Sequence, residues 1–145
     1  MIIDINIYKV LYILIKLYNM PVIEVSSTAE FDSYLLHGAP GSQLPHNNQY
    51  VFVDFYADWC GPCKRFAPTL EKMSEQYTSV TFLKVNCDEC PEVSDRYKVR
   101  SLPTFHMFKV GSTEPTISPI QGADKTKVEG ALKAVSEQIK PSEEF

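Results

Sequence analysis

The feature that most constrains this 145-residue chain is the hexapeptide at 59–64, Trp-Cys-Gly-Pro-Cys-Lys, which lies between a strand pattern and a helix pattern. A largely apolar run over residues 51–56 precedes it, and apolar residues at helical spacing follow it. A thiol at the start of a helix lies near unpaired backbone N–H groups and the positive end of the helix dipole, so the pKa of that thiol falls. The spacing therefore predicts a redox pair, Cys60 and Cys63, that cycles between dithiol and disulfide.

The two cysteines are expected to have different roles. Cys60 occupies the turn before the helix and is predicted to be the more exposed, so its thiolate would attack a substrate disulfide. Cys63 would then attack the Cys60 sulfur and release the reduced substrate. Gly61 and Pro62 keep the connection short, and Pro62 needs no N–H at the start of a helix.

This motif, within the longer run Val-Asp-Phe-Tyr-Ala-Asp-Trp-Cys-Gly-Pro-Cys-Lys, resembles the active site of the thioredoxin family. The resemblance implies an α/β thioredoxin fold over residues 21–140, with a mixed central sheet of about five strands and helices on both faces. It also implies a protein-disulfide reductase that serves electron transport in cell redox homeostasis. Such a protein binds no cofactor or metal, takes electrons from NADPH through a thioredoxin reductase, and acts on disulfide-containing client proteins.

Asp54 lies in the middle of the most apolar strand pattern, where an ionised carboxylate is costly to bury. Burial raises the pKa of a carboxyl group, which makes Asp54 a candidate proton acceptor and donor. The alternative is a residue at the strand edge that reaches solvent. The resemblance implies that Asp54 takes the proton from Cys63, and that Lys84 is the lysine near this carboxylate in the family. A surface lysine on a strand is the alternative for Lys84.

The segment 100–104, Arg-Ser-Leu-Pro-Thr, resembles the cis-proline loop of the same family. A cis bond would keep Pro103 beside Cys60 and leave the backbone of Leu102 free to pair with an extended substrate segment. An ordinary turn with a trans proline is the alternative.

Two further positions match the family, and one departs from it. Trp59 and Gly122 match positions that flank the site, where they would provide a flat apolar rim and an open surface for a partner peptide. Many thioredoxins have a second tryptophan where this chain has Tyr56. A tyrosine keeps the aromatic bulk, so we expect it to tune the site and to preserve activity.

Cys87 and Cys90 form a second Cys-x-x-Cys motif, which lacks the Gly-Pro pair and the strand–helix junction of the first. Their acidic neighbours disfavour a thiolate, so two reduced structural thiols are predicted, with a second disulfide or regulatory oxidation as alternatives. The four cysteines together read C-x2-C-x23-C-x2-C, which is longer than a zinc-ribbon spacing. A zinc-binding structural module is therefore an alternative function, although Trp59 and Pro62 have no role in a zinc site.

A third reading keeps the fold and changes the function to a thioredoxin-like disulfide isomerase or partner-binding domain. The Gly-Pro pair between the cysteines favours the reducing type by resemblance.

The length and composition of the chain fit one domain, with 44% hydrophobic and 22% charged residues. A net charge of −4 argues against a nucleic-acid partner, and we expect a monomer with no membrane partner.

The first 20 residues are dominated by Ile, Leu and Tyr. Asp4, the interrupting Lys16 and the lack of an Ala-x-Ala site argue against a secretory signal, and the missing Arg and Ser argue against a transit peptide. Lys9 and Lys16 argue against a membrane span, but they share one helical face, so an amphipathic segment is an alternative. We interpret residues 1–20 as an apolar extension and 141–145 as a polar tail. We expect a cytoplasmic protein, with organelle or membrane-surface targeting by residues 1–20 as the alternative.

Hydrophobic patterns predict strands at 22–25, 51–56, 80–86, 104–110 and 116–120. Helices are predicted after a Ser27 cap with capping-box spacing to Glu30, after Cys60, over 91–97, and after an Asp124 cap. The second of these contains Pro68, which should kink it. Two helices should bury residues spaced i, i+4, i+7, i+11: Phe66, Leu70, Met73 and Tyr77 in one, and Val128, Leu132, Val135 and Ile139 in the other. The loop at 39–48 is interpreted as an insertion.

Overall fold

The computed structural model describes residues 6–11, 22–39 and 49–139. The strands are β1 (Val22–Val25), β2 (Tyr50–Tyr56), β3 (Val80–Asn86), β4 (Thr104–Lys109) and β5 (Ile120–Gln121). The helices between them are α2 (Thr28–His37), α3 (Gly61–Gln76), α4 (Pro91–Arg96) and α5 (Lys125–Gln138). Nearly all of the loop interpreted as an insertion, and the tail at 141–145, lie outside the described residues.

The five strands form one mixed sheet in the order β1-β3-β2-β4-β5. β1, β2 and β3 are parallel, whereas β4 is antiparallel to β2 and β5 is antiparallel to β4. The predicted strand at 116–120 is wrong. β5 has only two residues, of which Ile120 lies inside the predicted range and Gln121 lies after it. A single bridge joins Pro115 to Phe108 before β5 begins. Pro115 and Pro119 have no backbone N–H, so this edge segment cannot continue the ladder.

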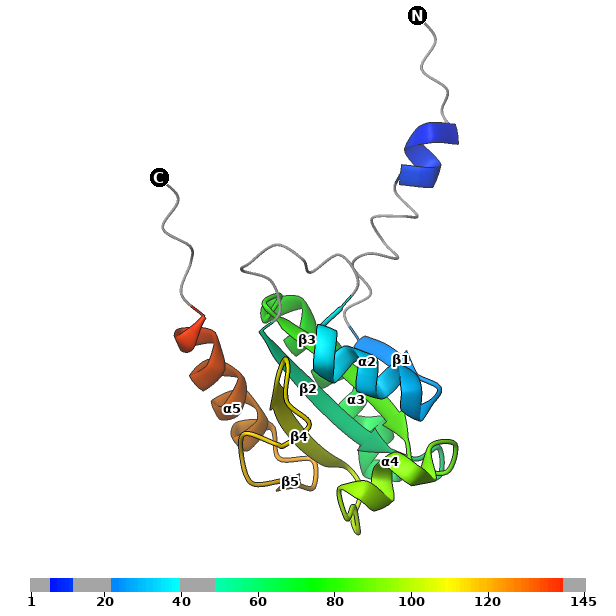
Figure 1. Ribbon diagram of the computed structural model, residues 1–145, viewed down its shortest axis with the longest axis vertical. Coiled ribbons are helices and arrows are strands. Elements are labelled where there is room, and N and C mark those ends of the chain that lie inside the picture. The colour runs from blue at the N-terminus through cyan, green and yellow to red at the C-terminus, as the bar shows by residue number, and fades with distance from the viewer. Residues whose placement is uncertain (1–5, 12–21, 40–48, 140–145) are drawn as a thin grey trace, which may run out of the picture.

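Two helices cover each face of the sheet (Figure 1). On one face, α3 and α5 pack on the large side chains of β2, β3 and β4. The predicted positions Phe66, Leu70 and Met73 of α3 are buried, and so is Tyr77, its C-cap residue. In α5, Val128, Leu132 and Val135 are buried. Ile139, the C-cap residue of this helix, is partly buried and packs against the same cluster. On the other face, α2 and α4 cover a second cluster that includes Phe31, Leu35 and Val93. The predicted layers are confirmed, and so are the predicted core positions apart from Ile139, which is only partly buried.

Local capping signals determine where two helices begin. The Ser27 hydroxyl accepts a hydrogen bond from the Glu30 N–H at 3.1 Å, and Asp124 accepts one from the Lys127 N–H at 3.0 Å. The Glu30 carboxylate accepts from the Ser26 N–H at 3.0 Å, so the return half of the predicted capping box is displaced by one residue. Both predicted N-caps are confirmed.

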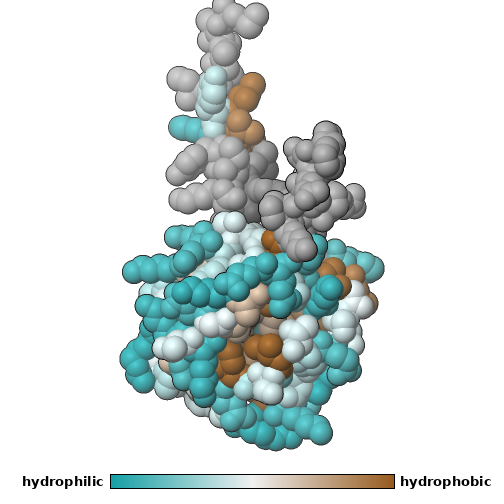
Figure 2. Space-filling view, turned by 90° about the vertical axis from the view of Figure 1, so that its left-hand side faces the viewer, coloured by the Kyte–Doolittle hydropathy of each residue, from teal (hydrophilic) through white to brown (hydrophobic). Residues whose placement is uncertain are grey.

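Residues 6–11 form a short helical segment with exposed side chains. Ile7, Val10 and Leu11 have helical spacing and are 61%, 55% and 50% exposed. Figure 2 shows one hydrophobic and one hydrophilic side on this segment, while the face of the folded domain in view is mostly hydrophilic. Within the described ranges, no helix has both the length and the apolar character needed to cross a membrane. Lys16, which the amphipathic alternative requires, lies outside these ranges.

Candidate active site

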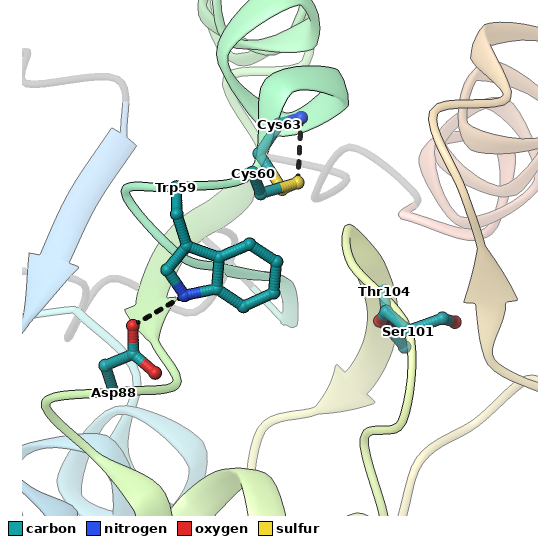
Figure 3. Close-up of a disulfide and its surroundings, with 6 residues drawn as sticks. All are labelled: Trp59, Cys60, Cys63, Asp88, Ser101 and Thr104. Atoms are coloured by element: carbon teal, nitrogen blue, oxygen red, sulfur yellow. Dashed lines mark hydrogen bonds between the residues drawn. A yellow bond between two sulfur atoms is a disulfide. The ribbon is translucent and has the colours of Figure 1, made fainter.

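The candidate site is built at the junction of β2 and α3, where a disulfide joins Cys60 and Cys63 (Figure 3). Their Cα atoms are 5.3 Å apart. Cys60 is the N-cap residue of α3, and its Sγ accepts a hydrogen bond from the Cys63 backbone N–H at 3.2 Å. In the reduced protein, the same N–H and the helix dipole would stabilise a Cys60 thiolate.

The prediction that Cys60 is the more exposed cysteine is wrong. Cys60 is 4% exposed and Cys63 is 5% exposed, because they form a small buried cluster with Tyr56, and Leu102 packs against this cluster. The cysteines differ in their backbone positions instead. The Cys60 sulfur receives the N-cap hydrogen bond, whereas Cys63 supplies the N–H that makes it. This difference supports the nucleophilic role of Cys60 better than exposure does.

Trp59 forms an exposed rim beside the disulfide. Its side chain is 72% exposed, and its Nε1–H donates a hydrogen bond to Asp88 Oδ2 at 2.9 Å (Figure 3). Asp88 was not among the predicted site residues. Its signal is its place in the chain: Trp59 follows β2 and Asp88 follows β3, and the carboxyl ends of neighbouring parallel strands meet at one edge of the sheet.

The loop before β4 has the expected conformation. The Leu102–Pro103 peptide bond is cis, and the Leu102 side chain packs on the cluster that contains both cysteines. The Thr104 hydroxyl donates to the Ser101 carbonyl at 2.6 Å and closes the loop. Both residues are labelled in Figure 3. The Gly122 N–H donates to the Pro103 carbonyl at 2.8 Å, and Gly122 has a φ of 87°, a conformation that favours glycine.

Asp54 is buried in the centre of β2, with 5% of the residue exposed. This excludes the solvent-reaching alternative. Burial raises the pKa of Asp54 to about 7, although the positive charge of Lys84 acts to lower it. Oδ1 of Asp54 accepts no hydrogen bond from the part of the chain that the structure describes. A carboxyl group with a pKa near neutrality can both accept and donate a proton under physiological conditions.

Lys84 lies opposite Asp54 in the register of β2 and β3, and is only partly exposed. Its Nζ lies 4.2 Å from the centroid of the Tyr56 ring. The Tyr56 hydroxyl donates a hydrogen bond to Glu24 of β1. The sequence placed Lys84 near the carboxylate only by resemblance, and it did not predict the contacts of Tyr56 with Lys84 and Glu24.

Cys87 and Cys90 are both free thiols, as predicted. Burial, together with the negative charges of Asp88 and Asp54, raises the pKa of Cys87 to about 11, although a hydrogen bond with Ser94 acts to lower it. Burial also raises the pKa of Cys90, which hydrogen-bonds the Val25 carbonyl at 3.7 Å. Neither thiol is therefore set up as a nucleophile.

The zinc alternative requires all four cysteines at one site. The structure places Cys60 and Cys63 in a small cluster with Tyr56, whereas Cys90 belongs to the cluster under α2 and α4 and Cys87 packs against it. Among the described residues, no three His, Cys, Asp or Glu side chains are grouped as a metal ion would require. The arrangement does not support a zinc module built on the two pairs.

Cys60 and Cys63 can exchange two electrons with another thiol pair. The disulfide closes within one turn of α3, and a group that titrates near neutral pH lies on the same face of β2 as Tyr56, which packs on both cysteines. Such a site on a mixed sheet between two helical layers is that of a thiol–disulfide oxidoreductase.

Comparisons with known proteins identify the family. The family model described as Thioredoxin matches residues 22–134. Thioredoxin 1 of Plasmodium falciparum (isolate 3D7) is 44% identical over 93 residues, which is 64% of this chain and 80% of that protein. A solved structure, "Initial Structural Analysis of Plasmodium falciparum thioredoxin", has a TM-score of 0.64 at 39% identity and covers 77% of this chain and 97% of its own. The chain belongs to the thioredoxin family and is a protein-disulfide reductase.

The same domain also occurs inside a larger relative. The peptide-N(4)-(N-acetyl-beta-glucosaminyl)asparagine amidase of Caenorhabditis elegans is 33% identical over 121 residues, which is 83% of this chain and 17% of that protein. The chain spans only about a sixth of the amidase, so the likeness concerns its thioredoxin-like part.

Proposed function

We propose that this chain reduces disulfides of client proteins with electrons that originate from NADPH and reach Cys60 and Cys63 through a thioredoxin reductase. The observation that carries this proposal is the Cys60 Sγ at the N-cap of α3, 3.2 Å from the Cys63 N–H that would stabilise its thiolate. The disulfide present in the structure corresponds to the oxidised product of the reaction.

The reaction proceeds by two thiol–disulfide exchanges. The Cys60 thiolate attacks one sulfur of the client disulfide, forming a mixed disulfide and releasing the other client sulfur as a thiolate. The Cys63 thiolate then attacks the Cys60 sulfur, which forms the Cys60–Cys63 disulfide and releases the second client sulfur. Two electrons pass to the client, and two protons complete its thiols.

Asp54 is the proton acceptor for Cys63 in this scheme. A thiol must lose its proton before it attacks, and Asp54 can take it because burial places the carboxyl pKa at about 7. After the exchange, the protonated Asp54 can return the proton to a departing client thiolate.

The rim of the site would hold an extended client segment. The backbone of Leu102 lies next to the cis proline, Trp59 offers a flat exposed ring, and Gly122 has no side chain to obstruct the approach. Backbone hydrogen bonds to an extended segment provide affinity with little sequence preference, which suits a reductase that acts on several clients.

We also propose that the protein is a cytoplasmic monomer in which residues 1–20 are an extension outside the domain. Imaging of the full chain beside a chain without residues 1–20 tests the location. The same location for both supports the proposal, and a change on deletion assigns targeting to the extension.

Insulin reduction with dithiothreitol tests the function, and NADPH consumption in the presence of thioredoxin reductase tests the electron source. Cys60→Ser should abolish both activities, whereas Cys63→Ser should trap mixed disulfides that mass spectrometry can identify. Cys90→Ser is the matched control, since it removes a thiol from outside the site, and it should remain active. Full activity of Cys60→Ser would contradict the mechanism.

A further inference from the structure

Three charged side chains lie in one row across the sheet. The register pairs Glu24 of β1 with Lys84 of β3, and Lys84 with Asp54 of β2. Residues paired across neighbouring strands point to the same face, so Lys84 stands between two carboxyl groups. Glu24 is exposed and Asp54 is buried. The closer the Lys84 ammonium lies to one of these carboxyl groups, the more it lowers the pKa of that group.

Tyr56 contacts both Lys84 and Glu24. It lies two residues after Asp54 on β2 and is 8% exposed, on the same face as the row. The face of its ring lies 4.2 Å from Lys84 Nζ, within cation–π range. Its hydroxyl donates a hydrogen bond to the Glu24 carboxylate. One side chain thus holds the cation on its ring and the competing anion on its hydroxyl.

The other groups around Asp54 leave Lys84 as the cation that acts on it. Phe105 of β4, which is opposite Asp54, carries no charge, and the disulfide of α3 does not titrate. Cys87, after β3, feels the charge of Asp54 but is a neutral thiol near pH 7. Within the described residues, no carboxylate oxygen lies within 4.0 Å of Lys84 Nζ, so the ammonium is held by the ring and not by a direct ion pair.

We propose that Tyr56 is a positioning residue for proton transfer: its ring holds the Lys84 ammonium beside Asp54, and its hydroxyl prevents Glu24 from attracting that ammonium away. The inference rests on the role of Asp54 given under the proposed function.

The pKa of Asp54, measured by carbon-13 NMR of its carboxyl group in the oxidised full-length protein, tests the inference without depending on turnover. Lys84→Met should raise this pKa by about 1 unit, because an opposite charge nearby is lost. Tyr56→Leu should raise it by about half as much, because the ammonium loses its ring contact. In the Lys84→Met background, Tyr56→Leu should add nothing.

Tyr56→Phe separates the two contacts, since it keeps the ring and loses the hydroxyl. It should raise the pKa of Asp54 slightly. In a chain that already carries Glu24→Gln, Tyr56→Phe should leave the pKa of Asp54 unchanged, because the competing carboxylate is absent. Tyr50→Phe is the matched control: Tyr50 lies on the same face of β2, but its hydroxyl donates to Gln138 of α5, so Asp54 should titrate as in the unmodified protein.

Two results would overturn the inference. One is an unchanged pKa of Asp54 in both Tyr56 variants while Lys84→Met raises it. The other is an equal effect of Tyr56→Leu with and without Lys84, which would assign the effect to burial. The proposed proton transfer has its own test, which does not depend on the NMR titrations. It would be refuted if Asp54→Asn left the pH profile of insulin reduction unchanged.

Discussion

Replacing Asp54 by Asn should stabilise the protein strongly above neutral pH. The folded chain holds this carboxyl with a pKa of about 7, against 3.8 for the ordinary carboxyl of the unfolded chain. Between these values the folded state binds a proton that the unfolded state has released, so the free energy of unfolding falls as pH rises. With respect to Asp54, the unmodified protein therefore has its full stability below about pH 4, and its loss of stability is complete once the pH has passed about 7.

The magnitude follows from the same two values. A difference of about 3 pH units, at about 1.36 kcal/mol per unit, corresponds to about 4 kcal/mol. Asp54 is 5% exposed, so solvent screening takes little from this figure. Domains of this size are commonly stable by about 5–15 kcal/mol, so the ionised carboxylate removes a substantial fraction of the total. In the proposed mechanism this carboxyl group takes up the Cys63 proton, a use that would account for keeping a destabilising group in the core.

Urea unfolding of the oxidised protein is the appropriate assay, because Cys60 and Cys63 do not titrate as a disulfide. Between about pH 5 and pH 8, the unmodified protein should lose about 3 kcal/mol relative to Asp54→Asn. Effects of other titrating groups occur in both proteins and cancel in this difference. Asp58→Asn, which changes an exposed carboxylate just beyond β2, should show no such difference. Parallel pH profiles for Asp54→Asn and the unmodified protein would refute the reasoning.

Three further predictions concern a buried histidine, one core residue beside one helix cap, and the reactivity of two cysteines. Burial lowers the pKa of His106, which has no hydrogen bond to either ring nitrogen within the described residues. Below about pH 6.5 this histidine takes up a proton in the unfolded chain but not yet in the folded one. The free energy of unfolding should therefore fall by up to about 1.4 kcal/mol per pH unit of acidification. Acid unfolding curves of His106→Phe should lack this decrease. Leu132→Ala should cost about 3 kcal/mol in urea unfolding because Leu132 is fully buried, whereas Asp124→Ala should cost about 1 kcal/mol by removing a helix cap; equal costs would contradict this. In the reduced protein at neutral pH, iodoacetamide should modify Cys60 well before Cys87, whose pKa is about 11, and mass spectrometry of timed samples would reveal the opposite order.

The sequence by itself determined the features that depend on near neighbours in the chain. The redox pair closes over three residues, and the caps at Ser27 and Asp124 are also three-residue contacts. The strand at 80–86 and the buried positions of α3 follow from hydrophobic periodicity, which a single element expresses by itself. The proposed roles of Asp54 and Pro103 needed the family resemblance in addition, because neither the partner in a proton transfer nor the isomer of a proline bond can be read from local spacing.

The tertiary structure alone decided the contacts between strands. Tyr56 reaches Glu24 over 32 residues and Trp59 reaches Asp88 over 29, because the register of β1, β2 and β3 brings these positions to one edge of the sheet. The equal burial of Cys60 and Cys63 depends on Leu102, from a loop some forty residues further along the chain. Register and loop packing are set by the whole core at once, so no window of the sequence contains them.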